Sequence, residues 1–199
     1  MTPRAATVTR NTRETAVSAT LVLDGTGKAD VNTGIGFLDH LLETLARHAR
    51  FDLSLSCRGD LAVDDHHTAE DCALALGGAL DQALGERRGV TRFGWAYAPL
   101  DEALARAVVD LSGRPSADVA LDLEREAIGG LACENIPHLF RSLAAAARLT
   151  LHVDVLKGEN DHHKAEAAVK ALALALRQAV ASSGFDDVLS TKGTLGEAP

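Results

Sequence analysis

The chain carries an internal repeat, and this repeat constrains the fold more strongly than any other feature of the sequence. Residues 65–84 align without a gap with residues 161–180, and eleven of these twenty aligned positions are identical. Extending the alignment backwards with a two-residue gap pairs His40 with His138. Because a duplicated chain folds most simply as two copies of one unit, both halves are expected to share one order of helices and strands.

Each half shows the same predicted order of elements: a strand hairpin, a helix, another strand and a long helix. Alternating apolar residues at 17–23 end in Asp24-Gly25, a pair typical of a hairpin turn, and a similar strand at 107–111 runs into the turn-forming residues 112–115. The long segments after each Asp-His-His are rich in alanine and leucine on all sides, which indicates buried helices. These patterns predict an α+β fold in which central helices are flanked by sheets.

The boundary between the halves is expected in the polar, turn-rich segment 85–91. We therefore assign residues 1–86 to the first half and residues 87–199, which include a polar C-terminal tail, to the second half. With 199 residues, 46% of them hydrophobic, the chain is long enough for both halves to share one core. One compact domain is predicted.

Composition argues against several classes of function. The net charge of −8 disfavours general binding to nucleic acid, whose phosphates attract clusters of lysine and arginine. No apolar run approaches the roughly 20 residues of a membrane span, and residues 1–13 are too polar for a secretory signal, so a soluble cytoplasmic protein is expected. The three cysteines, Cys57, Cys72 and Cys133, are widely spaced and are expected to be reduced core thiols.

Six of the eight histidines recur in register between the two halves. A histidine that only packs in the core or faces solvent has no reason to recur together with its neighbours, so the recurrence predicts a shared function. His48 and His152 align with other residue types, and we expect them to be structural or surface residues. The recurring pairs are His40 with His138, His66 with His162, and His67 with His163.

Glu70 and Glu166 extend each pair into the pattern His-His-x-x-Glu. On a helix, this spacing places the glutamate on the face of one of the two histidines, which is suitable for binding a metal ion. Adjacent histidines diverge by roughly 100°, so His66 and His67 are expected to serve different ions. The simplest division is two sites of three imidazoles and one carboxylate, a donor set that fits Mn, Fe, Zn or Ni. Asp65 and Asp161 are predicted to cap the two helices.

With these residues assembled, the sequence resembles the imidazoleglycerol-phosphate dehydratase family over essentially its whole length. The resemblance implies a duplicated α+β half-domain, with a central helix bundle sandwiched between two four-stranded sheets. It also implies a homo-oligomer of 24 subunits with active sites shared between neighbours. The motifs that carry the resemblance are residues 10–15 (Arg-Asn-Thr-Arg-Glu-Thr), 34–42, 65–71, 160–166 and 190–193 (Ser-Thr-Lys-Gly).

The family's reaction, dehydration of D-erythro-imidazole glycerol phosphate to imidazole acetol phosphate in histidine biosynthesis, is the activity that the resemblance implies. It further implies two Mn(II) ions per subunit, which bind the substrate imidazole as imidazolate and act as Lewis acids. The implied metal ligands are His40, His66, His67, Glu70, His138, His162, His163 and Glu166. The implied catalytic residues are Glu14, Glu70, Glu166, His67 and His163, with Glu14 as the candidate general acid or base. The implied substrate and phosphate ligands are Glu14, His40, Arg92, Arg114, Lys170, Ser190 and Lys192.

Two other readings remain open from the residues. Another di-metal enzyme, a hydrolase or a redox enzyme, would use similar ligands, although di-metal redox centres in helix bundles are usually richer in carboxylates. A metal-storage protein, or one that uses metal ions to assemble, would explain the histidines and glutamates. It would not explain Glu14 or the basic residues Arg92, Arg114, Lys170 and Lys192. Turnover distinguishes these readings.

Overall fold

The computed structural model describes residues 4–195. The outer ends of the two predicted halves, residues 1–3 and 196–199, lie outside the described residues. The first half contains β1 (Ala5–Asn11), β2 (Thr15–Val22), β3 (Ala29–Asn32), α1 (Gly36–Ala49), β4 (Asp52–Gly59) and α2 (His66–Leu84). The second half contains β5 (Phe93–Leu100), β6 (Ala103–Asp110), β7 (Ser116–Ala120), α3 (Asn135–Ala146), β10 (Thr150–Lys157) and α4 (Asp161–Ala179). A short pair, β8 (Ala127–Ile128) and β9 (Leu131–Ala132), precedes α3.

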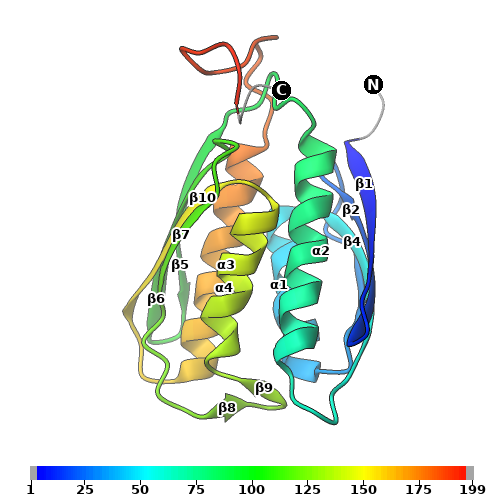
Figure 1. The fold of residues 1–199 in the computed structure, drawn as a ribbon. Coiled ribbons are helices and arrows are strands. Elements are labelled where there is room, and N and C mark those ends of the chain that lie inside the picture. The colour runs from blue at the N-terminus through cyan, green and yellow to red at the C-terminus, as the bar shows by residue number, and fades with distance from the viewer. Residues whose placement is uncertain (1–3, 196–199) are drawn as a thin grey trace.

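The helices form a central layer between two sheets (Figure 1). One four-stranded sheet has the order β1-β2-β4-β3 and the other has the order β5-β6-β10-β7, so both sheets have the same topology. α2 packs on β1 and β2, whereas α4 packs on β5 and β6. Contacts of α1 with α4 and of α2 with α3 join the two halves. The predicted α+β fold, a helix bundle between two four-stranded sheets, is confirmed.

Small residues allow the central helices to be buried on several faces. Gly94 of β5 shows how close the layers come, because a Cβ atom there would lie 1.9 Å from the carbonyl oxygen of Ala175 on α4.

The predicted boundary near residue 86 falls in the connection between α2 and β5. Cys57, Cys72 and Cys133 are free thiols, as predicted, but only Cys72 and Cys133 are buried, whereas Cys57 is half-buried. None of the helices in residues 4–195 combines the length and the hydropathy needed to cross a membrane.

The hairpin predicted at Asp24-Gly25 is wrong. β3 follows this turn but pairs in parallel with β4, and β4 occupies the position beside β2. The cause is Asp52 at the start of β4, whose carboxylate accepts the backbone N–H groups of residues 26–28 at 2.7 to 3.0 Å. These hydrogen bonds lower the pKa of Asp52, and the one from Lys28 has the largest effect. Together they hold the loop across the end of β4. The turn at 112–115 likewise leads into β7, which pairs in parallel with β10, so the hairpins are β1–β2 and β5–β6.

The prediction that Asp65 and Asp161 cap the two long helices is also wrong. The residue before each one does so: Asp64 and Asn160 accept the backbone N–H groups of residues 66 and 162, each at 2.9 Å. Asp65 instead accepts the N–H of Ala132 at 2.7 Å, and Asp161 accepts the N–H groups of residues 124 and 125. Both carboxylates therefore fasten the segment 124–132 beside the helix starts that carry the paired histidines.

Candidate functional site

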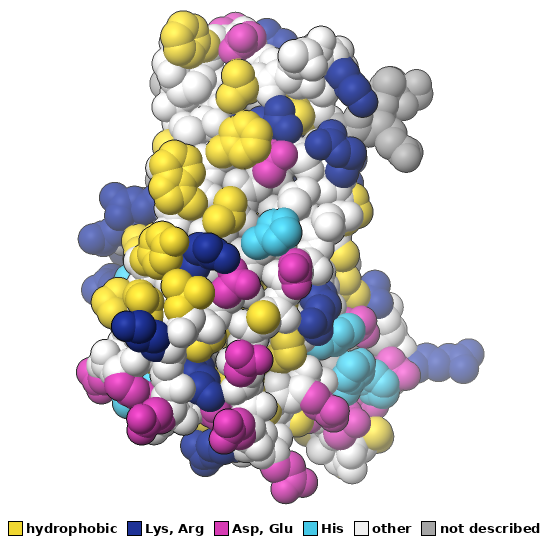
Figure 2. All heavy atoms as spheres, turned by 90° about the vertical axis from the view of Figure 1, so that its left-hand side faces the viewer, with side chains coloured by type: hydrophobic (Ala, Val, Ile, Leu, Met, Phe, Trp, Pro, Cys, Tyr) yellow, Lys and Arg dark blue, Asp and Glu magenta, His cyan; other side chains and the backbone are white. Residues whose placement is uncertain are grey.

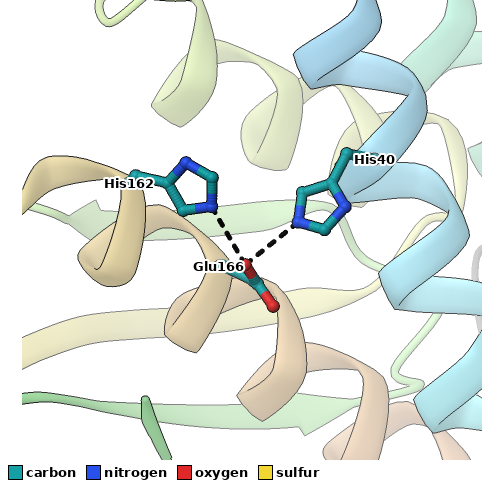
Figure 3. Close-up of side chains that lie close together, drawn as sticks. All are labelled: His40, His162 and Glu166. Carbon is teal, nitrogen blue, oxygen red and sulfur yellow. Dashed lines mark hydrogen bonds and ion pairs between the residues drawn. The ribbon is translucent and has the colours of Figure 1, made fainter. Parts of the chain in front are cut away.

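Three side chains from two helices meet where α1 lies against α4 (Figure 3). Nε2 of His40 on α1 lies 3.0 Å from Oε2 of Glu166 on α4. Nε2 of His162, one helical turn before Glu166, lies 3.2 Å from the same oxygen. The spacing of four residues puts His162 and Glu166 on one face of α4, directed at α1. We call these three residues the α1–α4 cluster.

A related cluster forms where α2 lies against α3. Nε2 of His138 on α3 lies 3.1 Å from Oε1 of Glu70 on α2, and the rings of His66 and His138 stack with their centroids 4.8 Å apart. We call His66, Glu70 and His138 the α2–α3 cluster. Each cluster takes a histidine and a glutamate from the His-His-x-x-Glu motif of one half and a single histidine from the other half. Neither half of the chain alone can form either cluster.

The donor atoms of both clusters fit a divalent transition-metal ion. In each cluster, one ligand atom from each of the three residues lies within 4.8 Å of the other two. Two ligands about 2.1 Å from an ion and at right angles are roughly 3 Å apart, close to the separations from Glu166 in the α1–α4 cluster. Imidazole nitrogens with a carboxylate and no thiolate suit Mn, Fe, Zn or Ni. One chain supplies two imidazoles and one carboxylate to each cluster, compared with the three imidazoles expected from the sequence.

Glu166 is held in its charged form before any ion binds. Burial raises the pKa of Glu166, but hydrogen bonds from Lys170 and His40 outweigh this effect, and the pKa falls to about 2. Nζ of Lys170 lies 2.8 Å from Oε1 of Glu166, four residues away on the same helix face. The carboxylate can therefore bind a cation without first losing a proton.

The two clusters differ in the residue that supports the first histidine of each motif. Nδ1 of His66 lies 2.8 Å from Oδ1 of Asn135, so Nε2 of His66 is free to bind an ion. Asn135 lies three positions before His138, and the residue three positions before His40 is Phe37. The ring of Phe37 packs on that of His162, with the centroids 4.9 Å apart. Neither Asn135 nor Phe37 is among the site residues predicted from the sequence. Their identical spacing from His138 and His40 is the signal that identifies them.

His67 and His163 lie outside both clusters. Each ring stands nearly perpendicular to that of the preceding histidine, at 79° for His67 and 86° for His163. Nδ1 of His67 lies 3.1 Å from Asp60, and Nδ1 of His163 lies 2.7 Å from Glu102. These hydrogen bonds raise the pKa of both histidines. Nε2 of each ring remains as an atom that could bind a metal ion.

Glu14 and Glu102 occupy equivalent hairpin positions but make different contacts. The β1–β2 and β5–β6 hairpins pair in the same register, and each glutamate immediately precedes the second strand. Glu102 accepts hydrogen bonds from the backbone of Asn160 and from His163, which lower its pKa to about 2. The side chain of Glu14 is 52% exposed and lies 3.7 Å from Nε2 of His67. Glu102 is not among the site residues predicted from the sequence, although an alignment of the two hairpins identifies it.

Four of the five residues predicted to bind phosphate line one cavity of about 520 Å³: Arg92, Arg114, Ser190 and Lys192. Arg92 is also paired with Asp110 at 2.7 Å, which fixes its guanidinium at the cavity wall. Lys170, the fifth, does not line this cavity, because it is paired with Glu166 in the α1–α4 cluster. Three cationic side chains and a hydroxyl are suitable for binding a phosphate group.

Figure 1 shows the starts of α2 and α4 at one end of the molecule and the C-terminal segment, which lines the cavity, at the other. The N–H of Arg92 donates to the carbonyl of Ala179, the last residue of α4, whereas His162 is the second residue of the same helix. At a rise of roughly 1.5 Å per residue, these helix positions are about 25 Å apart. A single small substrate cannot contact both within one chain.

Comparisons with known proteins give one consistent result. The imidazoleglycerol-phosphate dehydratase family model matches residues 33–176. The dehydratase of Phaffia rhodozyma is 56% identical over 197 residues, covering 96% of both chains. That of Phytophthora nicotianae is 58% identical over 192 residues, covering 96% of this chain but only 42% of its own length. The dehydratase structure from Pyrococcus furiosus superimposes with a TM-score of 0.81 at 38% identity, covering 94% of this chain and all of that one. The chain belongs to the imidazoleglycerol-phosphate dehydratase family, lyases of histidine biosynthesis.

Proposed function

We propose that this chain dehydrates imidazole glycerol phosphate to imidazole acetol phosphate (EC 4.2.1.19), with two Mn(II) ions per chain, in a cytoplasmic homo-oligomer with shared active sites. The observation that carries the proposal is the pair of equivalent clusters, α1–α4 and α2–α3. The substrate ring has two nitrogens that can bind metal ions, and this number matches the two equivalent metal sites of the chain. When bound, the two ions supply Lewis acidity to the imidazole ring.

The reaction needs this help because of where the proton is lost. The departing proton is not next to a carbonyl group, so no enolate can form, and the ring itself must accept electron density. The chain's own residues then have three tasks. Two imidazoles and one carboxylate in each cluster hold an ion, Glu14 exchanges a proton with the substrate's carbon or hydroxyl group, and the 520 Å³ cavity binds the phosphate.

Glu14 suits proton transfer better than its counterpart Glu102. The hydrogen bonds that lower the pKa of Glu102 tie its carboxylate to the start of α4 and to its own hairpin. The side chain of Glu14 is instead 52% exposed and lies 3.7 Å from His67. A general acid or base must reach the substrate, so the free carboxylate is the better candidate.

The separation of cavity and clusters supports shared active sites. The substrate, an imidazole with a three-carbon phosphate chain, is roughly 10 Å long by standard bond lengths. The helix positions that flank the cavity and the α1–α4 cluster are about 25 Å apart along α4. We therefore infer that the phosphate cavity of one copy faces the metal clusters of another. An assembly of 24 copies is the expectation from the family resemblance.

The outer face of the second sheet supports such an assembly. Phe93, Trp95 and Tyr97 alternate along the edge strand β5, all exposed, and Val108 of β6 is the cross-strand neighbour of Trp95. Figure 2 shows apolar side chains gathered on this face. The positions equivalent to Trp95 and Val108 on the first sheet are Thr7 and Thr20, which also pair with each other. Exposed apolar patches of this kind mark contact surfaces between proteins, and we assign this one to a second copy of the chain.

Turnover of imidazole glycerol phosphate tests the proposal. Metal-stripped protein supplied with Mn(II) should form the ketone product, detected by its reaction with a carbonyl reagent, and Glu14→Gln should lower kcat by roughly a hundredfold. Absence of product from folded protein that binds two ions per chain would refute the dehydratase and favour a metal-storage or assembly protein. A hydrolase or redox activity would instead appear with a different substrate class.

A further inference from the structure

The β1–β2 hairpin that carries Glu14 is fastened to α2 by a single buried carboxylate. Nε of Arg10, on β1, donates to Oδ1 of Asp71 at 2.6 Å, and Oγ1 of Thr15, on β2, donates to Oδ2. The Asp71 side chain is only 6% exposed. One residue therefore holds both strands of the hairpin, on either side of Glu14. We call Arg10, Thr15 and Asp71 the hairpin anchor.

The second half of the chain has no such anchor, although its backbone is arranged in the same way. The two hairpins share one pairing register, in which Arg10 corresponds to Ala98 and Thr15 to Ala103. In the ungapped helix alignment, Asp71 corresponds to Ala167. All three alanines are buried. The fold therefore accepts three alanines at these positions, so the polar anchor is not a requirement of the architecture.

The second hairpin is held in another way, through Glu102 itself. One oxygen of Glu102 accepts the backbone N–H groups of residues 159 and 160, and the other lies 2.7 Å from His163. The glutamate at the tip thus ties its own hairpin to the start of α4. Glu14 makes no corresponding hydrogen bond to the start of α2 among the described residues, because Asp60 contacts Nδ1 of His67 instead. The anchor replaces this tie and leaves the carboxylate of Glu14 free.

We propose that Asp71 is a positioning residue for the dehydration, acting through Glu14; this inference rests on the proposed function. Asp71 is adjacent in sequence to Glu70, which belongs to the α2–α3 cluster, so the anchor couples the hairpin to the helix that supplies this cluster. Misplacing a catalytic group by about 1 Å can cost a hundredfold in rate. Pairing of Thr15 with Gly59 of β4 holds one side of the hairpin tip, and the anchor holds the tip against α2.

The test compares kcat, KM and Mn(II) binding of the full-length assembled protein in four variants. Asp71→Asn weakens the anchor, and the triple variant Arg10→Ala/Thr15→Ala/Asp71→Ala copies the alanines of the second half, which the fold accepts. In both, kcat should fall roughly 10- to 100-fold, while KM stays within about threefold and two ions still bind. In a Glu14→Gln background, adding Asp71→Asn should lower kcat no further. The fourth variant, Asp24→Asn, removes a carboxylate paired with Arg4 at the far end of the same two strands and should leave kcat unchanged.

Each outcome is decisive. Normal kcat in the triple variant, or an equal loss of kcat from Asp71→Asn with and without Glu14, would overturn the positioning role. Loss of bound Mn(II) together with kcat would also overturn it, because Asp71 would then act on the α2–α3 cluster. An inactive wild type is a failure of the proposed function instead. In that case, faster amide hydrogen exchange at residues 12–15 in Asp71→Asn would still show that the anchor holds the hairpin.

Discussion

Co-assembly of two inactive variants should restore activity if active sites are shared between chains. Glu14→Gln removes the candidate acid or base, and Arg114→Ala damages the phosphate cavity. Glu14 lies beside His67, at the start of α2. The cavity includes Asp187, whose carbonyl accepts the N–H of Gly89 just beyond the far end of α2. From His67 to Leu84, 17 residues at a rise of roughly 1.5 Å each span about 25 Å. We therefore expect a substrate roughly 10 Å long to contact Glu14 of one copy and the phosphate cavity of another.

The expected size of the effect follows from random mixing. When the two variants are co-expressed in equal amounts, a shared site receives an intact Glu14 with a chance of one half and an intact cavity with a chance of one half. About a quarter of the sites are then intact, and kcat per site should reach about a quarter of the wild-type value. Each variant alone should retain roughly a hundredth or less.

The assay uses differently tagged variants purified in tandem, so that only mixed oligomers are measured. Arg92→Ala co-expressed with Arg114→Ala is the matched control, because both residues line the same cavity and no site can escape both defects. The control should remain inactive. Mixed oligomers of Glu14→Gln and Arg114→Ala with no more activity than either parent would refute the reasoning, since the two residues would then have to act within one chain.

Three further predictions address assembly, one metal cluster and the loop before β3. Trp95→Thr, which copies Thr7 of the first sheet, should weaken subunit association roughly tenfold in sedimentation experiments without unfolding the chain; an unchanged sedimentation profile would contradict the assigned contact surface. Asn135→Ala should weaken Mn(II) binding roughly 10- to 100-fold at the cluster that contains His66, leaving the other site unchanged in a calorimetric titration; equal weakening of both sites would argue against the role of Asn135. Because the folded-state pKa of Asp52 is lowered, its carboxylate stabilises the fold above the unfolded pKa near 4, and this contribution is lost as the pH falls through the folded pKa. The Tm difference between wild type and Asp52→Asn should therefore shrink below pH 4, and a difference independent of pH would show that the carboxylate charge is not involved.

The repeat predicts which residues act together, because side chains one helical turn apart in a repeated motif must share a face. It does not predict which helices become neighbours. His40 belongs to the same half as His66 and Glu70, yet it pairs with Glu166, because α1 packs on α4 and not on α2. Packing partners depend on the shapes of whole layers, and the local pattern around one histidine contains no information about them.

The errors have local causes that the sequence alone conceals. Asp24-Gly25 forms a turn, but Asp52, more than twenty residues later, captures the following amides and redirects the chain across β4. Asp65 and Asp161 occupy positions typical of caps, yet distant backbone N–H groups use their carboxylates. In each case a long-range hydrogen bond decides between two conformations that are equally consistent with the local sequence.

A titration of metal-stripped protein with Mn(II), in which bound ions and turnover of imidazole glycerol phosphate are measured on the same samples, tests whether the reaction depends on both clusters. Activity should rise until two ions are bound per chain. Glu70→Ala and Glu166→Ala should each lose one strong site and should both be inactive. Full activity with one ion or none bound per chain, or full activity in either variant, would contradict a reaction that depends on two equivalent metal clusters.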